Sequence, residues 1–202
     1  MTSLGTLPGG AESFAQDITN HGQVAGDASN GTPDPFPNMN VSPFGWGTET
    51  RGFVWRHGVM RDLGTLGGAD TLEYAQNNRG QITGVSYTNN TVTPATKIPT
   101  AEPYLWQHGH MTGLGSLGGH FGFANWINDQ GQVVGQSDLA GDQNTQPFLW
   151  QKGHRMRMLP TIGGGPGFAN WISPQGVISG SYYAPPNPVS YTHQTLPTIL
   201  LV

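Results

Sequence analysis

Short apolar runs bounded by turn-forming residues dominate the hydrophobic pattern of this chain. Typical runs are Phe14 to Thr19, Phe123 to Asn128 and Phe168 to Ser173. Each has about 4–6 residues, the usual length of a β-strand. No stretch keeps the 3.6-residue apolar period of an amphipathic helix. The pattern therefore predicts an all-β chain with no significant helix.

An internal repeat organises these runs. A block of the type Leu-Gly-Thr-Leu-Gly-Gly occurs four times, with starts at Leu4, Leu63, Leu114 and Leu159. From the second glycine of each pair, a Gly-Gln-Val-x-Gly type of motif begins 12 residues later in every copy. The paired positions are Gly10 and Gly22, Gly68 and Gly80, Gly119 and Gly131, and Gly164 and Gly176. Four identical spacings between matched motifs establish a repeated structural unit.

A third motif completes the unit. An aromatic–aliphatic–Trp run ends at Trp55, Trp106 and Trp150, and a turn glycine follows three residues later. The unit starts are 59, 51 and 45 residues apart, and most of this variation lies in one connection before the Trp. One connection that varies while the rest keeps its length is typical of a surface loop on a constant scaffold.

Each unit reads as four short strands, which cannot bury both faces of their sheet alone. Units of about 40–50 residues with four strands are typical of β-propeller blades. The pattern predicts that the Trp and Leu-Gly-Thr-Leu segments fill the space between blades, and that the glycine pairs form tight turns between them. Residues 1–188 would then be a β-propeller fragment of about three and a half blades, fewer than the about four to eight of a closed ring.

The motifs resemble those of a known repeat family. Asp62 to Gly68, Gly131 to Gly135 and Phe148 to Trp150 are similar in order and spacing to the bacterial extracellular HAF repeat family. The resemblance covers nearly all of residues 4–184. It implies a secreted, propeller-like protein analogous to kelch propellers, with no assigned activity.

The chain departs from the family pattern in two respects. Only the aromatic position of the His-Ala-Phe triplet is kept, at Phe53, Tyr104 and Phe148. In the second unit, Glu73 stands in a slot that holds alanine in the other units, at Ala15, Ala124 and Ala169. Residues 189–202 lie outside the repeat and resemble the translation of a sequencing-library adapter, so we expect them to be a non-native tail.

Composition and charge exclude several classes of protein. The chain has 31 Gly and 16 Pro, and its 8 Lys and Arg against 12 Asp and Glu give a net charge of −4. No basic face for a phosphate backbone is expected, so nucleic-acid binding is disfavoured. The absence of cysteine excludes disulfides and Cys-ligated metals. No apolar run is long enough for a membrane-spanning helix.

Candidate catalytic and metal-binding residues are few. His108 and His110 alternate along a strand, but Lys152 occupies the equivalent of His108, which favours a turn histidine over a metal ligand. The loop Asp138 to Asn144 lacks the closing glutamate of a calcium loop. No metal or cofactor is therefore predicted. The acids are scattered singly, and those to consider for catalysis are Asp17, Asp62, Asp70 and Asp129.

The longest connection, Asp27 to Glu49, carries Phe36, Phe44 and Trp46 among several prolines. These aromatic side chains would stack on sugar rings or dock a protein, unless they pack inward on their own unit. The sequence thus predicts a non-catalytic secreted scaffold that binds carbohydrate or protein through its loops. One alternative is a hydrolase or lyase whose site is completed by further blades. Another is a purely structural module of a larger surface protein, and the oligomeric state stays open.

Overall fold

The computed structural model of the chain describes residues 3–37, 39, 41–161, 164–183 and 198–201. Its strands follow the four sequence units. The strands of the first unit are β1 (Ser13–Ile18), β2 (Val24–Pro33), β3 (Thr48–Arg56) and β4 (Val59–Asp62). Those of the second are β5 (Thr71–Gln76), β6 (Ile82–Val92), β7 (Pro99–Gln107) and β8 (His110–Gly113). The prediction of an all-β chain is confirmed.

The third unit contains β9 (Gly118–Ile127), β10 (Val133–Leu139), β11 (Thr145–Trp150) and β12 (Arg157–Met158). The fourth contains β13 (Gly167–Ile172), β14 (Ile178–Tyr182) and β15 (Thr198–Leu201). Of residues 189–202, which we expected to be a non-native tail, only 198–201 are among the described residues. They form β15, which pairs with β14 where the other units have their Trp-bearing strand.

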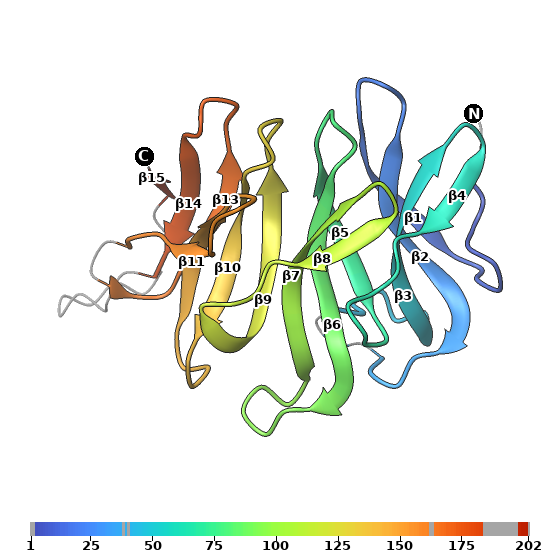
Figure 1. Cartoon of the computed structure of the whole chain (residues 1–202). Coiled ribbons are helices and arrows are strands. Elements are labelled where there is room, and N and C mark those ends of the chain that lie inside the picture. The colour runs from blue at the N-terminus through green and yellow to red at the C-terminus, as the bar shows by residue number, and fades with distance from the viewer. Residues whose placement is uncertain (1–2, 38, 40, 162–163, 184–197, 202) are drawn as a thin grey trace, which may run out of the picture.

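Within each unit, consecutive strands pair antiparallel. The first unit forms a four-stranded sheet and the fourth a three-stranded sheet, while the second and third share an eight-stranded sheet. A single parallel pairing, Ala101 with Phe121, joins those two units. None of the described sheets closes on itself. The units follow one another in a row, with the N- and C-termini at opposite ends (Figure 1).

A glycine facing a β-bulge recurs in every unit. The first strand carries a bulge, and the residue just before it pairs with the glycine that closes the second-strand motif. These pairs are Ala15 with Gly26, Glu73 with Gly84, Ala124 with Gly135, and Ala169 with Gly180. A Cβ on any of these glycines would lie 1.9–2.1 Å from a carbonyl oxygen of the first strand. Only glycine permits this close approach.

The turn between the first two strands is the same in all units. One side-chain oxygen accepts hydrogen bonds from the backbone N–H groups two and four residues later, and it belongs to Thr19, Asn77, Asn128 and Ser173. Each of the four turns also contains a glycine with φ between 74° and 84°, namely Gly22, Gly80, Gly131 and Gly176. Such side-chain-to-backbone bonds fix a turn without any contribution from a neighbouring strand.

The glycine pairs between units lie against the second strand of their own unit. A Cβ on Gly10, Gly68 or Gly119 would come within 3 Å of atoms of residues Ser29, Tyr87 and Asp138, respectively. The fourth unit differs. Gly164 has φ of 70° and open space around it, and Gly165 makes the close approach, to the carbonyl of Tyr183.

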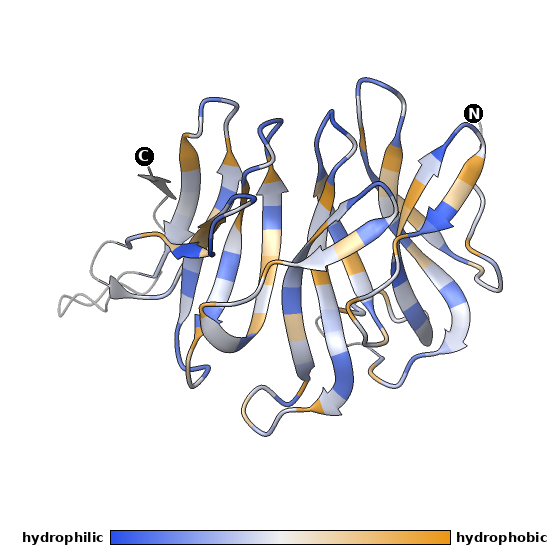
Figure 2. Ribbon diagram, viewed as in Figure 1, coloured by the Kyte–Doolittle hydropathy of each residue, from blue (hydrophilic) through white to orange (hydrophobic). Residues whose placement is uncertain are grey.

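The hydrophobic core lies between units. Apolar and polar positions alternate in bands along the strands (Figure 2), so each sheet offers an apolar face to its neighbour. The cluster between the first two units contains Ala25, Val54, Leu63, Ile82 and Tyr104, with Trp106 packed against it. Equivalent clusters lie between the second and third units and between the third and fourth units. Trp150 packs against the cluster between the second and third units. Trp55 packs on the face of the first sheet turned away from the second unit.

Hydrogen bonds between neighbouring units accompany this apolar packing. Asn77 donates to the carbonyl of Asn128 (2.9 Å), and Asn128 donates to that of Ser173 (3.0 Å). Gln16 and Asn125 donate in the same way to Glu73 and Ala169. No described segment forms a helix long and apolar enough to cross a membrane.

Gly135→Ala should destabilise the protein by about 1–3 kcal/mol, because its Cβ would overlap the carbonyl oxygen of Phe123 at 2.1 Å. Gly113→Ala is the matched control, since its Cβ would meet only the ends of the Glu102 and Leu66 side chains. Urea unfolding of both variants measures the difference. Equal losses of stability would contradict the close-approach explanation.

Candidate functional site

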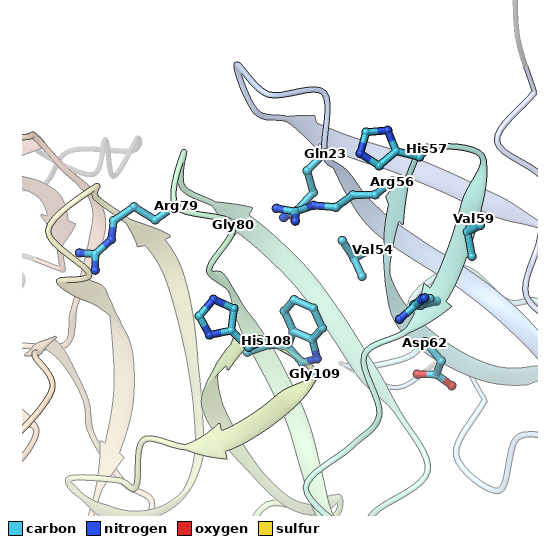
Figure 3. A pocket seen from close by; sticks show the side chains of 12 residues that line it. Gln23, Val54, Arg56, His57, Val59, Asp62, Arg79, Gly80, His108 and Gly109 are labelled. Atoms are coloured by element: carbon cyan, nitrogen blue, oxygen red, sulfur yellow. The ribbon is translucent and has the colours of Figure 1, made fainter.

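A groove of about 600 Å³ lies between the first and second units (Figure 3). Both units contribute to its wall. The first unit supplies Arg56, His57, Arg61 and Asp62 from β3, β4 and their turn. The second supplies Arg79, Trp106 and His108. The groove therefore exists only when the two units are packed together.

Two tight hairpin turns present the histidines of the groove. His57-Gly58 joins β3 to β4, with φ of 50° and 84°, and His108-Gly109 joins β7 to β8, with φ of 52° and 84°. Two successive residues with positive φ define the type I′ turn that suits the twist of a hairpin. Positive φ is uncommon for residues other than glycine, although histidine tolerates it better than most. The turns place equivalent imidazoles on successive units.

The groove carries an excess of positive charge. Three of the eight Lys and Arg residues of the chain line it, namely Arg56, Arg61 and Arg79. None of them forms an ion pair with a described residue. The single carboxylate in the lining, Asp62, accepts a hydrogen bond from the backbone N–H of Gly64 (2.7 Å). An anion entering the groove would thus meet three guanidinium groups that form no ion pair with a described residue, against one carboxylate.

Arg56 comes from the first unit and Arg79 from the second. Arg56 lies against Gly80, where a Cβ would come within 2.7 Å of its Nη2 atom. Arg79 donates to the carbonyl oxygen of Asp129 in the third unit (3.3 Å). An adjoining hollow of about 360 Å³ is lined by His21, Asn78 and both arginines. The cationic surface therefore continues beyond the groove.

Trp106 gives the groove an aromatic wall. It is partly buried and packs against the apolar cluster between the first two units. Val54 of the same cluster also lines the groove. The site thus combines guanidinium groups with an aromatic and aliphatic floor, a combination typical of small-molecule sites.

The structure separates the three aromatic residues of the long loop. Phe36 points inward and packs edge-on against Tyr87, with ring centroids 5.8 Å apart. Phe44 is 36% exposed and stacks on Trp46 at 4.5 Å, with Phe14 beside it at 6.1 Å. This loop lies at the opposite end of β3 from the His57 turn. Phe44 and Trp46 therefore form a surface distinct from the groove.

The four acids considered for catalysis occupy different places. Asp62 lines the groove, and Asp129 accepts from the backbone N–H of Asn78 (2.9 Å). Asp17 accepts from the backbone N–H of Gln76 at 3.3 Å. Asp70 is buried and accepts from that of Thr50 (2.8 Å). Burial raises the pKa of Asp70 to about 7, an effect that Asp34 and Glu49 increase and the Thr50 bond opposes.

Instead, the structure pairs Asp27 with Glu73, neither of which the catalytic reading of the sequence had selected. Both side chains are fully buried between the first two units. Asp27 Oδ1 accepts from the backbone N–H of Glu73 (2.8 Å), and Oδ2 accepts from Gln16 (2.8 Å). Neither carboxylate oxygen of Glu73 has a hydrogen-bond partner among the described residues.

Burial is the main influence on the ionisation of this pair. It raises the pKa of Asp27 to about 7, although the hydrogen bonds from Glu73 and Gln16 act in the opposite direction. It also raises the pKa of Glu73 well above its ordinary value, and the charges of Asp27 and Asp17 add to the effect. A low-dielectric environment disfavours the ionised carboxylate.

Within the part of the chain that the structure describes, no three His, Cys, Asp or Glu side chains are placed to hold a metal ion together. Comparisons of the chain with protein-family models, curated proteins and solved structures found no match.

Phe36→Ala should lower the stability by about 1–3 kcal/mol, because it removes a half-buried ring from the contact with Tyr87. Phe44→Ala should change it by less than about 1 kcal/mol, because that ring lies on the surface. Thermal or urea unfolding compares the two variants. A larger loss of stability for Phe44→Ala than for Phe36→Ala would contradict a loop with Phe36 inside and Phe44 on the surface.

Proposed function

We propose that this chain is part of a secreted bacterial repeat scaffold of the HAF type, arranged as propeller blades, and that it binds an acidic glycan without catalysis. The arrangement of the units supports a blade-like scaffold. Each of the first three units contributes four strands that pair antiparallel with one another, and the first strands β1, β5, β9 and β13 contact one another in turn. Adjacent inner strands are expected when blades surround an axis.

The groove between the first two units is the proposed binding site. The observation that carries this proposal is that three arginines that form no ion pair with a described acid line the same groove as the partly buried Trp106. Guanidinium groups form paired hydrogen bonds with carboxylate and sulfate oxygens. An aromatic ring adds an apolar surface against which the C–H face of a sugar can pack. An acidic glycan combines both chemistries in one molecule.

The positions of the acids favour binding over hydrolysis. Glycoside hydrolysis commonly needs two carboxyl groups on either side of the scissile bond. Asp62 is the single carboxylate in the described lining of the groove, and Asp27 and Glu73 are buried away from solvent. A purely structural module, the other alternative, gives no reason for three unpaired arginines to gather in one groove.

The test is binding to heparin and to polygalacturonate, with neutral dextran as the comparison. Heparin presents sulfates and polygalacturonate presents carboxylates only, so the two probes separate these chemistries. We expect saturable binding to at least one of them that weakens with added salt, and none to dextran. Equal retention of dextran, or no saturable binding of either polyanion, would overturn the proposal.

Arg56→Ala should weaken polyanion binding by about tenfold, since one charge-assisted hydrogen bond contributes about 1.5–3 kcal/mol. Arg157→Ala is the matched control, because Arg157 is exposed on β12, far along the chain from the groove. Surface plasmon resonance at fixed salt measures both variants. If the two substitutions weaken binding equally, the attraction is a general charge effect and the groove is not the site.

A further inference from the structure

We propose that Asp27 and Glu73 form a proton-operated lock between the first two units, so that losing their protons loosens the units and weakens ligand binding in the groove. The link to ligand binding rests on the function proposed above. The lock itself is a property of the interface and does not depend on any ligand.

Neither acid has an acidic counterpart in the other units, and the two residues meet at one junction. Glu73 occupies the slot before the bulge, where the other units have alanine. Asp27 follows the motif-closing Gly26, where the other units have Val85, Gln136 and Ser181. The two residues come from different sheets and are joined by the bond from Glu73 N–H to Asp27. Because the repeat folds without either acid in its other units, the fold itself does not require this pair.

The surroundings of Glu73 favour the protonated acid. Its side chain is 0% exposed, and neither oxygen has a partner among the described residues. The charged groups that act on it are Asp27 of β2 and Asp17 of β1, both acidic. Tyr104 of β7 and Tyr74 of β5 are the other titratable groups around the pair, and burial raises the pKa of each.

Among the residues that the structure describes, no other element brings a positive charge to the pair. From β1, Gln16 contributes a neutral amide. The ion pair of Arg51 with Glu49 on β3 belongs to the surroundings of Asp70. Phe123 of β9 packs against Tyr74. Two carboxylates buried side by side without a cation cannot both ionise without a large cost.

The sign of the pH effect follows from this arrangement. An acid whose pKa is higher in the folded than in the unfolded protein keeps its proton more tightly when folded. Its stabilising contribution is complete below the ordinary carboxyl pKa of about 4 and is lost as the pH rises. For Asp27, this loss extends to about pH 7. Packing of the two units should therefore weaken from acid toward neutral pH.

The pair and the groove share one interface. The apolar cluster that contains Ala25, Val54, Ile82 and Tyr104 lies at the same junction of the two units. Val54 lines the groove, and the Tyr104 hydroxyl donates to the carbonyl of Leu72, next to Glu73. Since the walls of the groove come from both units, loosening their contact separates Arg56 from Trp106. Proton binding and ligand binding then support each other reciprocally.

The lock is tested first without ligand, by melting temperatures from about pH 4 to about pH 8 for the wild type, Glu73→Gln and Glu73→Ala. The amide variant should match the wild type at the acid end and melt at a higher temperature at the alkaline end. Glu73→Ala restores the residue that the other units carry and should also flatten the profile. The double variant Asp27→Asn/Glu73→Gln should also lose the part of the pH dependence of the melting temperature that Asp27 contributes. Wild-type and Glu73→Gln curves that run parallel would overturn the lock.

The link to the groove is tested by heparin binding over the same pH range at fixed salt. Two histidines, His57 and His108, also line the groove and must be kept out of this comparison. The comparison is therefore made in a His57→Asn/His108→Asn background, since asparagine suits the same type I′ turns. Binding should still fall several-fold with rising pH in this background, and Glu73→Gln should abolish the fall.

The possible results separate the two proposals. If heparin and polygalacturonate fail to bind at every pH, the proposed function is wrong, and the melting curves still decide the lock. If the melting curves change with pH as expected but binding does not, or if Glu73→Gln leaves the fall in binding unchanged, the regulatory link is wrong and the binding function stands.

Discussion

The structure depends on the packing of each four-stranded sheet against the next. A small antiparallel sheet has two faces and cannot bury them within itself. The described apolar clusters lie mainly at the junctions between successive units, and side-chain amides of one unit bond to carbonyl groups of the next. How deeply an apolar side chain is buried therefore depends on whether a neighbouring unit covers the face of the sheet on which it lies. Ile18 is 66% exposed on the first sheet, whereas Ile127 and Ile172 in the same slot of later units are 2% and 1% exposed.

The strands and turns could be predicted because their signals are local. Glycine spacing, the turn residues and the short apolar runs act within one unit, and the observed strands follow them. The direction of a loop side chain is not local. Phe36 turns inward because it packs against Tyr87 of the next unit, whereas Phe44 stacks on Trp46 of its own loop. Nothing in the loop sequence distinguishes these two phenylalanines.

The candidate functional residues likewise depend on contacts between units. Arg56 and Arg79 each stand beside an ordinary turn, and only the packing of two units makes them walls of one groove. Glu73 was detectable as a break in the alanine slot. Its partner Asp27 was not, because the other units vary at that position. The junction of the first two units thus carries unpaired cations in the groove and two buried carboxyl groups deeper inside. The net charge of −4 gives no sign of this cationic groove.

The variable connection and the groove lie at opposite ends of β3. Insertions and deletions before the Trp-bearing strand therefore leave the turns that shape the groove untouched, even where a loop residue such as Phe36 contacts the next unit. A duplicated unit would bring its own packing faces with it, and the exposed part of its loop could then change length. Such a chain can grow by whole units and diversify at one rim while the other rim keeps its geometry.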